Sequence, residues 1–188
     1  QPEDGSASFT DSVGRTVEVP AEITSVAVSG PLAQMVLFAL CPDKLVALPT
    51  SGTRALSSTW PPSTTICPAG PALRRQGRAE SGDPLGLRRQ VVIDVGEPKD
   101  TIVEDLDALQ EQTGIPFVHM SATIDTMGDA YRKLGELLGM EEEAETLATY
   151  CDETYAMVKD VAEHVEKANL LYITGDAGLN VIAQGSYH

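Results

Sequence analysis

The run Val91-Val92-Ile93-Asp94-Val95 decides the fold class of this chain. Four of its five residues are β-branched and apolar, which is typical of a strand buried on both faces of a parallel sheet. Gly96-Glu97-Pro98-Lys99 follows as a loop, and residues 100–114 then carry apolar side chains at helical spacing up to a terminal glycine. A buried strand, a short loop and a helix in this order indicate one unit of an α/β protein.

Strands and helices alternate on both sides of this unit. The expected segments are a hairpin over 9–20, a strand over 25–28, a helix from Pro31, and strands over 44–48 and 117–120, with a helix over 123–138. The helix from Pro31 is expected to bury Leu32, Met35, Val36 and Ala39. Short connections between alternating strands and helices predict an α/β lobe, with a parallel sheet covered by helices on both faces.

Residues 141–165 are predicted to form one uninterrupted helix with an apolar stripe. Its length of roughly 38 Å, at 1.5 Å per residue, exceeds what one small lobe needs and suits a strut between two lobes. Strands over 170–173 and 179–182 then begin a new unit. The predicted organisation is an N-terminal ligand-binding lobe over 1–140, a connecting helix over 141–167, and over 168–188 the start of an incomplete C-terminal α/β lobe.

Composition excludes several classes of function. The formal net charge of −15 over 188 residues argues against nucleic-acid binding, which needs a basic face. No apolar run approaches the ~20 residues of a membrane span. The polar start at Gln1 is read as a mature terminus from which a signal segment has been removed. A lipid anchor in the removed N-terminal part is the one link to the membrane that we expect. An incomplete second lobe would expose apolar surface, so self-association is expected.

The residue types of metal and catalytic sites are present but scattered. His119, His164 and His188 show no metal-binding spacing, and His119 alternates inside a strand as a core or rim residue does. Cys151 falls on the apolar stripe of the long helix, which favours a core role over a nucleophile. Neither a nucleophile elbow nor a phosphate-binding loop is present. We therefore predict no catalysis, no metal site and no cofactor of the protein's own.

Residues 62–89 fit no helix or strand pattern, and they hold five of the eight arginines. Codons compatible with residues 74–88, read one nucleotide later, spell GGKGELNLETLLASD. That text has the pattern of a capped amphipathic helix leading into the strand at Val91. We interpret the segment as the product of compensating frame errors, either in the DNA or in its reading.

Three stretches resemble one family of transport proteins. They are FTDSVGRTVEVP at 9–20, Ser29-Gly30-Pro31 with its helix, and LFAL at 37–40 followed by DKLV at 43–46. They are similar to the siderophore, haem and cobalamin class of periplasmic substrate-binding proteins of ABC importers. The resemblance implies two α/β lobes joined by one long helix, with the ligand held between them. It also implies an extracytoplasmic place, as a periplasmic protein or a cell-surface lipoprotein, and an importer permease as partner.

The predicted function is capture of an iron–siderophore or similar metal chelate. The alternatives are a haem- or cobalamin-binding protein of the same class, a chelatase-like α/β enzyme, and a structural module of a larger receptor. A chelatase would place a histidine and an acidic residue together in the cleft between the lobes.

The ligand is expected at the loops that follow the strand ends, where α/β sheets generally bind. Trp60 can stack on a flat ligand, and Arg54 or Lys99 can pair with an anionic chelate. The predicted contact residues are Ser29, Gly30, Pro31, Thr50, Ser51, Arg54, Trp60, Glu97, Pro98, Lys99 and Ser121.

Overall fold

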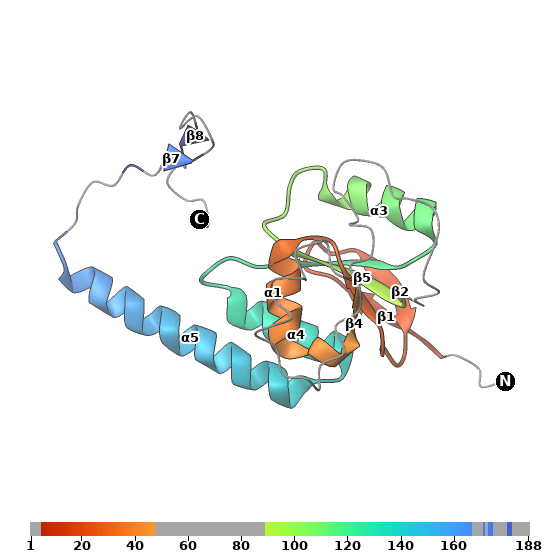
Figure 1. Ribbon diagram of the computed structural model, residues 1–188, viewed down its shortest axis with the longest axis horizontal. Helices are drawn as coiled ribbons and strands as arrows, with labels where there is room; N and C mark the ends of the chain where they lie inside the picture. The colour runs from red at the N-terminus through yellow and green to blue at the C-terminus, as the bar shows by residue number, and fades with distance from the viewer. Residues whose placement is uncertain (1–4, 48–88, 167–170, 172, 175–179, 182–188) are drawn as a thin grey trace, which may run out of the picture.

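A four-stranded parallel sheet forms the centre of the computed structural model, which describes residues 5–47, 89–166, 171, 173–174 and 180–181 (Figure 1). The strand order is β4 (Leu45–Ala47), β3 (Val26–Val28), β5 (Val91–Gly96) and β6 (Phe117–Ser121). All six residues of β5 are buried, as expected for a central strand with both faces covered. The predicted parallel sheet is confirmed.

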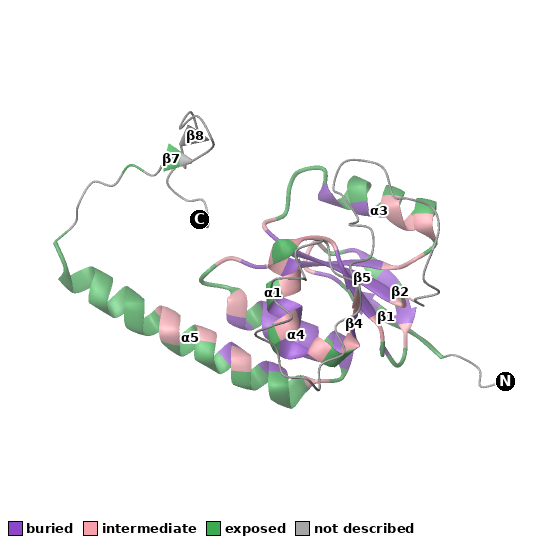
Figure 2. Ribbon diagram, in the orientation of Figure 1, coloured by how far each residue is buried: buried purple, intermediate pink, exposed green. Residues whose placement is uncertain are grey.

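Helices cover both faces of this sheet. Ile93 and its neighbours of the same parity pack with α1 (Pro31–Leu40) and α4 (Met127–Leu138) in one buried cluster. Val92 faces the other way and packs in a smaller cluster with α3 (Ile102–Thr113). Figure 2 shows the buried residues gathered between these helices and the strands. The two-faced coverage predicted from the alternation of segments is confirmed.

A β-hairpin covers the outer edge of β6. Its strands, β1 (Ser6–Thr10) and β2 (Thr16–Pro20), pair antiparallel as predicted. From the turn between them, the Ser12 backbone N–H donates to the carbonyl of His119 at 3.0 Å. Arg15 Nη1 donates to the carbonyl of Phe117 at 2.9 Å. These polar contacts occupy backbone groups that an edge strand would otherwise leave open to another chain.

The predicted buried face of α1 is displaced by one residue. The helix buries Ala33, Val36, Leu37 and Leu40, whereas Ala39 is exposed and Met35 is 65% exposed. Only Gln34 is polar among its ten residues, so the apolar pattern does not select one face.

The helix predicted over 123–138 begins later than expected, at Met127. The Thr123 hydroxyl donates to Asp125 Oδ1 at 2.5 Å, and the Thr126 hydroxyl accepts from the Thr123 backbone N–H at 3.0 Å. These local bonds hold a turn in place of a first helical turn. A short 3-10 turn, η1 (Pro42–Lys44), likewise replaces the start of the strand predicted over 44–48.

The long helix α5 (Glu141–His164) ends within one residue of its prediction. It lies against α4, where an ideal Cβ on Gly135 would come 2.5 Å from the Cβ of Ala144. Arg132 of α4 also donates to Glu145 at 2.8 and 3.0 Å and to Asp152 at 2.9 Å. Only the first half of α5 is therefore fastened to the lobe.

The predicted apolar stripe of α5 is buried over part of its length. Ala144 and Ala148 are buried, but Val158 and Val165, both in the predicted stripe, are exposed. Figure 2 shows this change along the helix. Beyond α5, β7 (Ile173–Thr174) and β8 (Asn180–Val181) form an antiparallel pair. Over the described part of the chain, no helix is both long and apolar enough to cross a membrane.

Candidate functional site

Three of the predicted ligand loops meet at the carboxyl edge of the sheet, formed by Ser29–Pro31, Glu97–Lys99 and Ser121. The Ser29 backbone N–H donates to the carbonyl of Ile93 at 3.1 Å, which places the end of β3 beside β5. The Ala122 N–H donates to the carbonyl of Gly96 at 3.2 Å, and Gly96 is paired with Ser121. The sheet register therefore brings together loops that are up to 92 positions apart in the sequence.

The predicted residues at this edge differ in exposure. Pro31, Pro98 and Lys99 are exposed, while Ser29, Gly30, Glu97 and Ser121 are half-buried. Gly96 adopts φ 153° before the second loop, a backbone conformation that residues other than glycine rarely adopt. Thr50, Ser51, Arg54 and Trp60 lie outside the described residues. The ligand contacts of the whole set stay a prediction.

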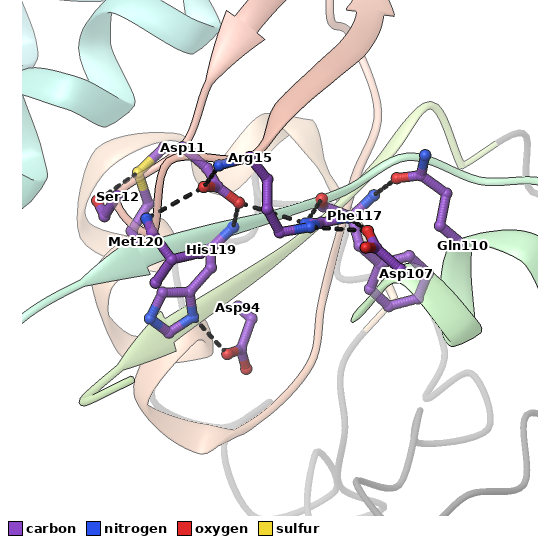
Figure 3. Close-up of polar contacts among 10 residues, drawn as sticks. Asp11, Ser12, Arg15, Asp94, Asp107, Gln110, Phe117, His119 and Met120 are labelled. Carbon is purple, nitrogen blue, oxygen red and sulfur yellow. Dashed lines mark hydrogen bonds and ion pairs between the residues drawn. The ribbon is translucent and has the colours of Figure 1, made fainter. Parts of the chain in front are cut away.

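A polar chain that the sequence did not suggest runs from this edge into the sheet. The Ser29 hydroxyl donates to Asp94 Oδ1. Asp94 Oδ2 lies 2.8 Å from His119 Nδ1, as Figure 3 shows. Asp94 is 6% exposed and His119 is 0% exposed. His119 Nε2 is buried and has no hydrogen-bond partner among the residues that the structure describes. His119 is therefore a core residue, as its position in an alternating strand predicted.

Asp94 and His119 each stand out in the sequence as a polar residue in a buried strand, but only the strand register shows that they are partners. Asp94 and His119 interrupt two otherwise apolar buried strands, and a buried polar group requires a partner. The register pairs these two residues directly across β5 and β6. That pairing depends on long-range alignment of strands, which the pattern of either strand alone does not encode.

The turn after β6 adds an apolar side chain close to the carboxyl edge. Ile124 is exposed, and it follows Thr123, whose hydroxyl is engaged with Asp125 and Thr126. An exposed isoleucine next to polar loops offers a contact for the apolar part of a ligand. The sequence pattern did not reveal this contact, because residues 123–138 were predicted to form one helix.

The described residues offer little metal or nucleophilic chemistry. Among them, no group of three or more His, Cys, Asp or Glu side chains is placed to hold a metal ion. Burial raises the pKa of the Cys41 thiol to about 11, and burial also raises the pKa of Cys151. Both thiols stay protonated at neutral pH, whereas a nucleophile or a metal ligand needs the thiolate.

The sequence matches no family model and no curated protein. Solved structures do resemble it. An ABC transporter solute-binding protein from Sulfurospirillum deleyianum superposes with a TM-score of 0.74 at 18% identity, over 96% of this chain and 58% of its own. The periplasmic heme-binding protein RhuT from Roseiflexus has a TM-score of 0.51 at 21% identity, over 81% and 56%. The molybdate-bound periplasmic protein MolA from Haemophilus influenzae gives 0.60 at 14%, over 85% and 55%.

These likenesses concern the fold, because every identity is low. The chain spans little more than half the length of each of these three structures. Over that span, the parallel sheet with helices on both faces follows the same architecture. The chain therefore has the α/β fold of the solute-binding proteins of ABC transporters, and the resemblance noted in its sequence is confirmed at the level of the fold.

Proposed function

We propose that the protein captures an iron–siderophore or similar metal chelate outside the cytoplasm and delivers it to the permease of an ABC importer. The observation that carries this proposal is the meeting of three strand-exit loops at the carboxyl edge. In α/β sheets this edge is where ligands generally bind. Capture without catalysis also suits an edge whose described residues include no activated nucleophile.

The chemistry of the edge supports a large ligand with mixed character. Lys99 is exposed there and can pair with an anionic chelate, while Ile124 can contact an apolar part. The first half of α5 is fastened to α4, and the rest extends away from the lobe (Figure 1). This arrangement supports our proposals of a second binding surface beyond the helix and of a connecting helix over 141–167.

Haem and cobalamin remain candidate ligands of the same class. A heme-binding protein and a molybdate-bound protein are both among the similar structures, so the fold accommodates different ligands. The chelatase alternative is favoured by one observation, the meeting of His119 with Asp94. Both residues are buried within the sheet, however, whereas metal insertion needs a histidine and an acid that reach a bound substrate.

The test is a binding titration with a charge-matched control. Ferric hydroxamate and catecholate chelates, haem, cobalamin and molybdate are titrated into the full-length protein, with both lobes, by calorimetry and by fluorescence of Trp60. We expect a ferric chelate to bind. Lys99→Glu should weaken an anionic chelate about tenfold, or about 1.4 kcal/mol. Lys159→Glu makes the same charge change on an exposed part of α5 and should leave affinity unchanged.

Two outcomes contradict the proposal. One is a folded chain that gives neither heat nor a fluorescence change with any of these probes. The other is equal weakening by both charge variants, which indicates general electrostatic attraction rather than contact at the carboxyl edge.

A further inference from the structure

The Ser29 hydroxyl stands at the boundary between the carboxyl edge and the interior of the sheet. It is half-buried and donates its single proton to Asp94 Oδ1. The other carboxylate oxygen, Oδ2, faces His119 Nδ1 at 2.8 Å. Two groups that can donate are thus directed at the two oxygens of one buried carboxyl group, which is the arrangement that an ionised carboxylate satisfies.

The tautomer of the His119 ring decides which residue is the donor in its hydrogen bond with Asp94. With Nδ1 protonated, the ring donates to Asp94 and leaves only a lone pair at the buried Nε2. With the proton on Nε2, a buried donor would have no acceptor, since no described residue forms a hydrogen bond with Nε2. Unpaired buried N–H groups are rarer than unpaired acceptors. The burial of Nε2 therefore favours the Nδ1–H tautomer, in which His119 donates a hydrogen bond to Asp94.

Because the Ser29 hydroxyl donates its proton to Asp94, the Ser29 oxygen has free lone pairs and no proton to offer a ligand. Among the described residues, no group donates to that oxygen. We infer that Ser29 is a specificity-determining residue that accepts a hydrogen bond from the ligand, with Asp94 and His119 as positioning residues. The preferred ligand presents an amide N–H, hydroxyl or ammonium at this point, and a carboxylate or ester oxygen is disfavoured. This inference rests on the proposed function and narrows its substrate class.

The substitution Asp94→Asn reverses the hydrogen bond between residue 94 and Ser29, while the bond from His119 keeps its direction. The amide oxygen must face the His119 Nδ1–H, so the amide NH₂ faces Ser29 and donates to its oxygen. The Ser29 O–H then points toward the ligand, and the residue becomes a hydrogen-bond donor. The substitution leaves the shape of the site unchanged and inverts the ligand chemistry that it prefers.

The test uses two ferric tris-hydroxamate chelates that differ in one linkage, an amide in one and an ester in the other. Wild-type protein should bind the amide chelate about tenfold more tightly, because the ester leaves Ser29 without a donor. Asp94→Asn should abolish or reverse this preference. Ser29→Ala should also abolish it, without reversal. Circular dichroism checks that both variants fold.

Nitrogen-15 NMR of His119 in the free protein gives a readout that needs no ligand. The inference expects a protonated Nδ1, and an Nε2–H tautomer overturns it. A preference for the amide that survives Asp94→Asn in a folded protein also overturns it. If no ferric chelate binds wild-type protein, the proposed function fails, while the His119 spectrum still decides which way the Ser29 hydroxyl points.

Discussion

Replacing Asp11 by asparagine should cause a large loss of stability, although the side chain keeps its shape. Asp11 is 2% exposed and lies in the turn of the hairpin. Its Oδ1 accepts from the backbone N–H groups of Val13 at 3.1 Å and Arg15 at 2.9 Å. Its Oδ2 accepts from Arg15 Nη1 at 3.3 Å and from the His119 N–H at 3.4 Å (Figure 3).

In the asparagine variant, the amide oxygen can replace Oδ1, but the NH₂ group then faces two donors. Breaking a buried charged pair by changing one partner costs about 3–5 kcal/mol. That is a large part of the ~5–15 kcal/mol that stabilises an ordinary domain. Urea unfolding followed by circular dichroism measures the change in the free energy of unfolding. The slope of this free energy against urea concentration should stay the same, as expected when only stability is lost.

Asp107→Asn is the matched control for this experiment. Arg15 also donates to Asp107 Oδ1, at 2.6 and 2.9 Å, but the Asp107 side chain is 61% exposed. Ion pairs with an exposed partner are worth about 0–1 kcal/mol, so this variant should lose little stability. A loss below about 1 kcal/mol for Asp11→Asn, or equal losses for both variants, would refute the reasoning from burial.

Four further predictions concern other parts of the chain. Gly135→Ala should cost about 1–3 kcal/mol by overpacking α4 against α5, while Gly139→Asn, in open space at φ 64°, should cost less in the same urea assay. The Cys41 pKa is raised by burial from 9.0 to about 11, so stability should fall as pH rises through that interval, where only the unfolded thiol ionises. The exposed valines of α5 should promote self-association, which light scattering would show to be lower for Val158→Lys. If the frame error lies in the reading of the DNA, the protein lacks Arg78 and a tryptic map should contain no peptide ending there; finding one would reject that interpretation.

Strand runs carried most of the predictable information about the fold. A β-branched run such as 91–95 has few ways to be stable except inside a parallel sheet, so its pattern alone determined its environment. The length of α5 was equally predictable, because its helical residues continue without a glycine or proline. In α1 nearly every residue is apolar, so only the tertiary contacts decide that Met35 faces outward.

The carboxyl edge was predictable in outline and not in its polar detail. The rule that parallel strands end at one edge selected the loop residues Ser29, Lys99 and Ser121 without knowledge of their contacts. The link between Asp94 and His119 depends on register, which is a property of two strands together. The pattern of each strand alone shows one polar residue among apolar ones, and it cannot show that the two residues satisfy each other.

The attachment of α5 makes it a lever arm. Its contacts with Gly135 and Arg132 lie on the first half of the helix, and about 18 Å of helix continues beyond Asp152 to His164. A rotation of about 10° at this fulcrum would move the far end by about 3 Å at a rise of 1.5 Å per residue. Substitutions between α4 and α5 that never approach the carboxyl edge would then change the aim of whatever the helix carries. Damage at that joint would therefore misalign the helix as well as lower the stability of the lobe.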